Sequence, residues 1–115
     1  MTTNEITKLD KLFQIKVLEL HPHSVIAGNA TVAHHFIHKA KGLSMRWYLP
    51  NGVSLTNSQH GDIHGAKRAE LEKMIIRKLG NTWRDDLRIQ ERKIVKNLKY
   101  QSVLNHLMGL SENYV

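Results

Sequence analysis

The sequence contains no cysteine, and this absence limits the chemistry available to the protein. Without thiols there can be no disulfide bond and no thiolate ligand, so a metal ion could be held only by histidine, aspartate or glutamate. Apolar runs long enough to cross a membrane are absent as well. The N-terminus, MTTNEITKLD, lacks the basic and apolar regions of an export signal. We therefore expect a protein of the cytoplasm.

Acidic residues are also few relative to basic ones. Lys and Arg number 17 against 10 Asp and Glu, which gives a formal net charge of +7. From Ala66 onward the chain has eleven Lys or Arg residues and six acids, so the C-terminal half carries most of the excess. Such an excess favours a polyanionic partner, and we expect DNA rather than a membrane. With 41% apolar and 23% charged residues, the 115 residues are expected to form one folded domain.

The N-terminal part of the chain predicts a helix over residues 4–20. Apolar residues recur there every three or four positions, which is the spacing of one helical face. Thr2 and Glu5 stand three apart, as a capping box requires, and Pro22 disfavours helical geometry in the residue before it. We therefore expect an amphipathic helix that ends near His21 and packs its apolar stripe on the rest of the domain.

Short strands are predicted next, at residues 30–37, 45–48 and 53–55. The Pro-Asn-Gly sequence between the last two is typical of a tight turn. The chain then becomes helical from Asn57 or Ser58, either of which could serve as the N-cap. The expected architecture is an α+β fold, with a small antiparallel hairpin and a helix between the N-terminal helix and basic C-terminal helices.

The C-terminal half is predicted to be helical, in segments that end at Gly80 and Gly109. Thr82, with Asp85 three residues later, indicates the start of a new helix after the first of these glycines. The expected buried stripe of that helix is Trp83, Leu87, Ile94 and Leu98. The last five residues are expected to fray. His106 lies among apolar residues of the last helix and is expected to be structural.

Five of the eight histidines fall between Val32 and Gly65. His60 and His64 stand four apart, so on a helix they project from the same side and can bind one metal ion. On a strand, His34 and His35 point to opposite faces, so one can ligate while the other remains available for proton transfer. That division suits hydrolysis at a metal site. An HxxxH pair by itself is a weak indication, since partly buried structural histidines are the alternative.

The stretch as a whole resembles the HNH, or His-Me finger, nuclease family. The ββα-metal motif of that family runs from a histidine region through an asparagine to a terminal histidine region. AHHFI looks like its strand-borne first segment, RWYLPNGVSL like the block before its helix, and QHGDIH like its terminal HxxxH. Residue types, order and gaps agree together over about residues 9–65. The resemblance implies one nuclease domain over residues 1–115, with an N-terminal helix (1–20), the motif (30–65) and a basic helical extension (66–115).

Carried over by position, the resemblance assigns roles to the histidines and the asparagine. His35 becomes the general base that deprotonates the attacking water, and Asn51 braces the loop and orients that histidine. His34, His60 and His64 become the ligands of one divalent ion. Mg²⁺ is the expected metal, and three imidazoles also suit Mn²⁺, Ni²⁺ or Zn²⁺.

The activity implied is that of a metal-dependent DNA endonuclease, which nicks DNA or cuts both strands and leaves 5′-phosphate ends. The phage-type character of the motif suggests a bacteriophage or mobile-element origin and action in the host cytoplasm. Arg46 is expected to contact a phosphate, and Trp47 to anchor the core. The cations expected to contact DNA are Lys39, Lys41, Arg46, Lys67, Arg68, Arg77, Arg84 and Arg88.

One departure from the family pattern concerns structural zinc. Phage-type members often hold the motif with a zinc knuckle of two cysteine pairs, and this chain has Ser24, Ala27, Thr56 and Gln59 at those positions. A structural zinc is thereby removed, whereas every position expected to be catalytic is retained. The flanking helices must then supply the stability.

Three alternatives to a general endonuclease stay open. A structure-selective nuclease, such as a Holliday-junction resolvase, would work as a dimer on branched DNA. A non-catalytic DNA-binding descendant would keep the fold without the reaction. A metal-buffering protein would bind metal without DNA, although the clustered arginines argue against it. A homodimer or a recruiting partner protein is compatible with the sequence.

Overall fold

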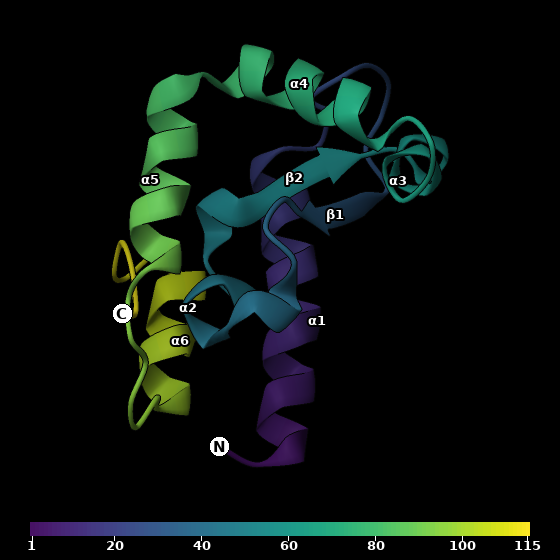
Figure 1. Ribbon diagram of the computed structural model, residues 1–115. Coiled ribbons are helices and arrows are strands. Elements are labelled where there is room, and N and C mark those ends of the chain that lie inside the picture. The colour runs from purple at the N-terminus through teal and green to yellow at the C-terminus, as the bar shows by residue number, and fades with distance from the viewer.

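The computed structural model, which describes residues 1–115, is organised around a two-stranded antiparallel hairpin with helices on both faces (Figure 1). Strand β1 (Val32–His35) pairs with β2 (Gly52–Leu55), in a register that sets His34 opposite Val53. Side chains alternate between the two faces along each strand. The α+β class and the order of N-terminal helix, hairpin and further helices agree with the prediction.

The N-terminal helix α1 (Thr3–Leu20) covers one face of the hairpin. It begins at the predicted capping box, in which Thr2 and Glu5 bond reciprocally, and it ends at His21. Gly52 faces α1 so closely that a β-carbon at this position would collide with the helix. The glycine therefore permits the close packing of helix and strand. The residues of α1 that are buried in this contact are Leu9, Phe13 and Val17.

The other face of the hairpin is covered by α3 (Asn57–Ile63) and α4 (Arg68–Leu79). The N-cap of α3 is Thr56, one residue before the predicted Asn57 or two before Ser58. The Thr56 hydroxyl accepts from the backbone of Gln59, whose side chain bonds back to the Thr56 amide, so this helix also starts with a capping box. The buried residues that join this face in one cluster include Val53, Leu55, Ile63, Leu71 and Ile75.

The connection from β1 to β2 differs from the prediction. Residues 45–48 do not form a strand, because α2 (Leu43–Arg46) and two 3₁₀ turns, η1 (Lys39–Lys41) and η2 (Leu49–Asn51), occupy the connection. The predicted Pro-Asn-Gly turn instead leads directly into β2. The reason is that Asn51 is fully buried and its side chain bonds inward, so it closes no exposed turn.

The chain ends in α5 (Asn81–Glu91) and α6 (Tyr100–Leu107). The N-cap of α5 is Gly80, with φ of +96° and no side-chain cap, so the predicted start at Thr82 is wrong. Ile94 is 81% exposed instead of buried, because α5 ends before it and the helical periodicity no longer applies. None of the helices combines the length and the apolar character needed to cross a membrane.

The C-terminal residues are anchored, contrary to the prediction that they fray. The Tyr114 hydroxyl donates to the carbonyl of Leu43 at 2.8 Å and accepts from the amide of Trp47 at 3.1 Å. The Lys93 ammonium donates to the carbonyl of Val115 at 2.8 Å. These contacts attach the end of the chain to α2 and to the segment after α5.

Candidate metal centre

Three histidines from β1 and α3 converge, and these two elements lie side by side in the fold (Figure 1). His34 comes from β1, and His60 and His64 come from the C-terminal part of α3 and its C-cap. One ring nitrogen from each lies within 4.8 Å of the other two. His34 is buried, His60 is half-buried and His64 is exposed, so the group opens to solvent on one side. This three-histidine group could hold a metal ion.

The spacing of His60 and His64 and the protonation of the group fit a divalent ion. Two nitrogens bound to one ion at about 2.1 Å stand about 3.0–3.4 Å apart, for angles from octahedral to tetrahedral. The Nε2 atoms of His60 and His64 are 3.1 Å apart. Burial lowers the pKa of His34 to about 3, and the neighbouring His60 and His64 add to the effect. Burial also lowers the pKa of His60. Neutral imidazoles are the form that binds metals.

His35 lies on the opposite face of the strand, as side-chain alternation requires. Its ring stacks on Phe13 of α1, with centroids 4.6 Å apart and planes 15° from parallel. Its Nε2 is 2.9 Å from the carbonyl oxygen of Arg46. Because a carbonyl oxygen only accepts, Nε2 carries the hydrogen and Nδ1 keeps its lone pair. Burial lowers the pKa of His35, although the hydrogen bond to Arg46 opposes the shift.

Asn51 holds the loop that follows His35. Its Oδ1 accepts from the amide of Ile37 at 2.8 Å, and its Nδ2 donates to the carbonyls of Ile37 at 2.9 Å and Met45 at 3.4 Å. The backbone carbonyl of Asn51 also accepts from the amide of Phe36 at 3.0 Å. These contacts begin one residue after His35, so Asn51 braces the backbone that carries the histidine.

Arg46 is engaged by an acidic residue of α1. Its Nε and Nη2 donate to the two carboxylate oxygens of Asp10 at 3.0 and 2.8 Å, in a bidentate pair. The indole nitrogen of Trp47 donates to the same carboxylate at 2.9 Å, and Trp47 is buried in the core. The pair holds the backbone whose carbonyl receives the His35 hydrogen bond. We therefore leave Arg46 out of the DNA-contacting set that the sequence suggested.

Hydrogen bonds join the four positions, Ser24, Ala27, Thr56 and Gln59, at which the resemblance would place cysteines. The Ser24 hydroxyl donates to Oε1 of Gln59 at 2.5 Å, and the Thr56 amide donates to the same oxygen at 2.9 Å. Nε2 of Gln59 donates to the carbonyl of Ala27 at 2.8 Å. Gln59 directly precedes His60, so this network fixes the start of the helix that carries two of the three histidines.

A small cleft of about 50 Å³ runs beside the histidines. Arg68 lies on its wall and pairs with Glu72 at 2.7 Å. Phe36 also lines the cleft, and the guanidinium of Arg84 stands 5.3 Å from the centre of its ring. Nη1 of Arg84 is buried and has no hydrogen-bond partner. The histidines that line the cleft are His34, His35, His38 and His64.

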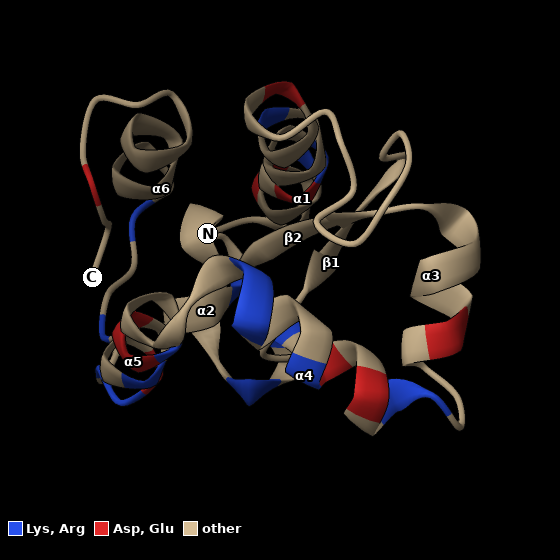
Figure 2. Ribbon diagram, turned by 90° about the horizontal axis from the view of Figure 1, so that it is seen from above, with Lys and Arg blue, Asp and Glu red and all other residues tan.

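The remaining predicted DNA contacts are spread over a wider surface. Figure 2 shows Lys and Arg on α4, on α5 and on the segment that leads into α4, with α1 on the other side of the hairpin. Arg88 stands 3.4 Å from Asp85. Among the predicted set, Arg68 is brought to the histidine cleft, and the exposed ones outside its wall are Lys39, Lys41, Lys67, Arg77 and Arg88.

Two residues of α1 that support the site were not predicted. Gln14 clamps β1 from its outer edge: its Oε1 accepts from the amide of Ala33 at 3.0 Å, and its Nε2 donates to the Ala33 carbonyl at 2.8 Å. Asp10 orients Arg46, as described above. Asp10 and Gln14 are four residues apart, directly after the buried Leu9 and Phe13. Polar residues at the border of an apolar helical stripe often contact the neighbouring element, and this pattern could have indicated Asp10 and Gln14 from the sequence.

Comparisons with protein-family models, with curated proteins and with solved structures find no match to this chain.

Proposed function

We propose that the protein is a metal-dependent DNA endonuclease that hydrolyses phosphodiester bonds. The observation that carries the proposal is the division between two adjacent histidines. His34 joins His60 and His64 in the ligand group, whereas His35 is held by the carbonyl of Arg46 and keeps one ring nitrogen unbonded. Both members of the pair line the same cleft. A ligand group beside an unligated base is the combination that hydrolysis at a metal requires.

Each residue then has a chemical task. Nδ1 of His35 accepts a proton from the attacking water, and the Arg46 carbonyl keeps the ring oriented through Nε2–H. A divalent ion held by the three histidines would neutralise charge on the phosphate and on the leaving oxygen. Arg68, on the wall of the cleft, supplies a cation that is suited to a phosphate oxygen.

The test is cleavage of supercoiled plasmid in Mg²⁺, Mn²⁺ or Ni²⁺, each against EDTA. We expect metal-dependent conversion to nicked or linear DNA. His35→Ala should lower the rate at least about a hundredfold, since it removes the base. The same variant should retain Co²⁺ binding, because the His35 ring is not one of the three proposed ligands. His64→Ala should lose both cleavage and tight Co²⁺ binding.

The matched control is His23→Ala, which changes an exposed loop histidine and should leave cleavage unchanged. Linear product formed without accumulated nicks would indicate paired active sites, and preferential cutting of a four-way junction would indicate a resolvase. A folded protein that binds DNA but cleaves none with any of the three metals would overturn the nuclease proposal. A non-catalytic DNA-binding module would then be the remaining function of this fold.

A further inference from the structure

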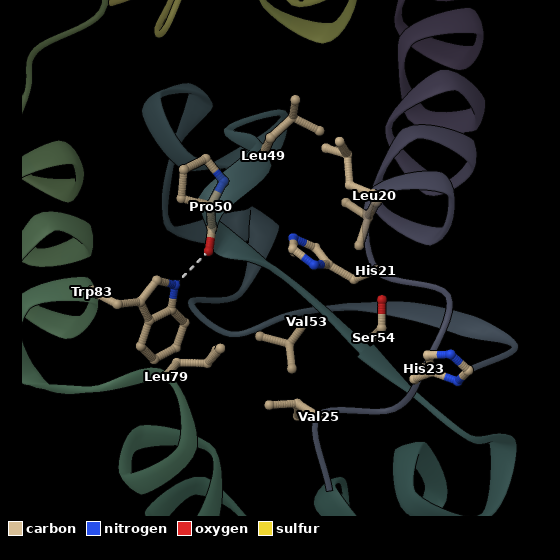
Figure 3. A pocket seen from close by; sticks show the side chains of 12 residues that line it. Leu20, His21, His23, Val25, Leu49, Pro50, Val53, Ser54, Leu79 and Trp83 are labelled. Atoms are coloured by element: carbon tan, nitrogen blue, oxygen red, sulfur yellow. Dashed lines mark hydrogen bonds between the residues drawn. The ribbon is translucent and has the colours of Figure 1, made fainter. Parts of the chain in front are cut away.

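A second concave site lies between the C-terminal end of α1, strand β2 and the junction of α4 with α5 (Figure 3). Its volume is about 420 Å³, within the range of about 300–1,000 Å³ that small-molecule sites occupy. It shares no lining residue with the histidine cleft. Its walls are mainly apolar, with Leu20, Val53, Leu79 and Trp83 among them.

The polarity of the pocket restricts what it can take up. No Lys, Arg, Asp or Glu lines it, so a charged ligand would find no permanently charged partner there. Its polar side chains are His21, His23 and Ser54, besides the indole nitrogen of Trp83. That nitrogen is already used, because it donates to the carbonyl of Pro50 at 2.7 Å (Figure 3). The pocket therefore suits a neutral molecule.

Ser54 provides the second observation. Its side chain is buried, and its hydroxyl oxygen has no hydrogen-bond partner in the protein. Figure 3 shows this oxygen on the side of His21, whose ring points toward the middle of the pocket. Buried hydroxyls are rarely left unpaired, because the missing hydrogen bond costs stability. An unpaired hydroxyl at the wall of an apolar pocket is suited to one polar group of a ligand.

The backbone of β2 argues for a small molecule rather than an added peptide strand. The carbonyl of Ser54 already accepts from the amide of Val25 at 3.0 Å, on the edge of β2 that faces away from β1. An extended peptide could not pair with that carbonyl without displacing the segment around Val25.

We propose that this pocket binds a neutral small molecule, with an apolar body and one hydrogen-bonding group directed to the hydroxyl of Ser54. This inference is independent of the nuclease proposal, because it involves neither the metal ligands nor DNA.

The experiment is a titration of the metal-free, full-length protein with 2-naphthol, followed by NMR of the leucine and valine methyl groups. We expect saturable shifts of the Leu20, Val53 and Leu79 signals. Naphthalene-2-sulfonate, which has the same rings but a charge, should bind at least about tenfold more weakly.

Two variants locate the binding. Leu20→Trp narrows the mouth of the pocket and should abolish the shifts of Val53 and Leu79. Ile94→Trp makes the corresponding change at an exposed position outside the pocket and should leave 2-naphthol binding intact.

Ser54→Ala distinguishes a ligand-binding hydroxyl from a structural one. It should weaken 2-naphthol about fivefold and raise the melting temperature of the free protein, since it removes an unpaired buried hydroxyl. A lower melting temperature with unchanged affinity would contradict the role of Ser54. The proposal would be overturned if the folded wild type gave no saturable shifts up to the solubility limit of the probe. Equal binding of the sulfonate, or unchanged binding in Leu20→Trp, would also overturn it.

Discussion

At the scale of single residues, the histidines form two groups. In one, both ring nitrogens are engaged by hydrogen bonds inside the fold; in the other, at least one ring nitrogen is not. Nε2 of His106 accepts from the amide of Leu49 at 2.9 Å, and its Nδ1 is 3.3 Å from the carbonyl of Ser111. Both of its nitrogens are therefore engaged, and His106 is structural, as its apolar neighbours suggested. His34 instead directs its ring to two other histidines, and His35 has one bond only. The second group is therefore the one that can bind a metal ion or accept a proton.

Asn51→Ala should reveal how much one buried amide contributes. The substitution leaves the polar backbone groups of Ile37 and Met45 without their partner, and we expect the free energy of unfolding to fall by about 3 kcal/mol. Urea denaturation measures the loss. Asn4→Ala, at an exposed position of α1, should change stability by less than about 0.5 kcal/mol. A loss below about 1 kcal/mol for Asn51→Ala would contradict the bracing role.

His106 should make the folded protein sensitive to mild acid. Burial lowers its pKa, against the hydrogen bonds to the backbone of Ser111 and Glu112, which raise it. The unfolded chain then binds the proton more readily than the folded one. The stabilisation is fully present above about pH 6.5, the ordinary pKa of histidine, and is lost as the pH falls below that value.

The measurement is the free energy of unfolding between pH 7 and pH 5. We expect it to fall less steeply in His106→Gln than in the wild type, because the substituted side chain does not titrate. His23→Gln, in an exposed loop, should keep the wild-type slope. Equal slopes in His106→Gln and the wild type would show that His106 does not cause the acid sensitivity.

At the scale of elements, α3 depends on contacts outside itself. It has seven residues, which is too short for a helix to be stable alone in water. Hydrogen bonds of Gln59 connect its first turn to the loop at Ser24 and Ala27. Its buried Ile63 packs into the core cluster that it shares with strand β2 and α4. Hydrogen bonds to a distant loop thus hold the first turn of this helix in place.

Gln59→Ala should therefore affect both stability and metal binding. It removes three hydrogen bonds, so we expect a loss of about 2–3 kcal/mol in the free energy of unfolding. Because His60 and His64 are carried by α3, the affinity for Co²⁺, measured by absorption, should also fall about tenfold. Gln90→Ala is the matched control: it removes a buried amide that donates to the carbonyl of Ser44. It should lower stability without changing Co²⁺ affinity, and equal affinities in the two variants would refute the positioning role of Gln59.

At the scale of the whole molecule, the net charge of +7 is distributed unevenly with respect to the histidine cleft. Arg68 lines the cleft and α4 carries four Lys or Arg residues against two acids, whereas α1, on the opposite face of the hairpin, carries three Lys against three acids. A DNA duplex that reached the cleft would meet the α4 and α5 side of the molecule (Figure 2).

The double variant Lys67→Gln/Arg68→Gln, at two exposed positions beside the cleft, should bind DNA more weakly and with a smaller dependence on salt. Each lost phosphate contact reduces the slope of log K against log salt by about 0.9, so we expect a reduction of about 1.8. Fluorescence anisotropy with a labelled duplex at several salt concentrations measures both quantities. Lys8→Gln/Lys11→Gln removes the same charge from exposed positions of α1 and should leave the slope unchanged. Equal slopes for the two double variants would mean that DNA does not bind at the cleft.

Local patterns determined what could be predicted from the sequence. The capping box and apolar spacing predicted α1, the spacing of His60 and His64 placed both on one side of α3, and strand alternation separated His34 from His35. In each case the residues concerned lie within one element, where backbone geometry relates neighbours directly. The three-histidine group itself required one further step, the resemblance in the order of the motifs.

Tertiary structure alone decided the features that depend on residues far apart in the chain. The Arg46–Asp10 pair joins positions 36 residues apart, the Ser24–Gln59 bond spans 35, and the Tyr114 contact with Leu43 spans 71. Residues 45–48 were predicted as a strand because their side chains favour one, yet the chain forms α2 through Arg46, and Met45, Trp47 and Tyr48 are buried in the core without a strand partner. The pocket at Ser54 could not be predicted from the sequence either, because its walls come from three parts of the chain. Such contacts have no local pattern, since packing partners are selected by the fold as a whole.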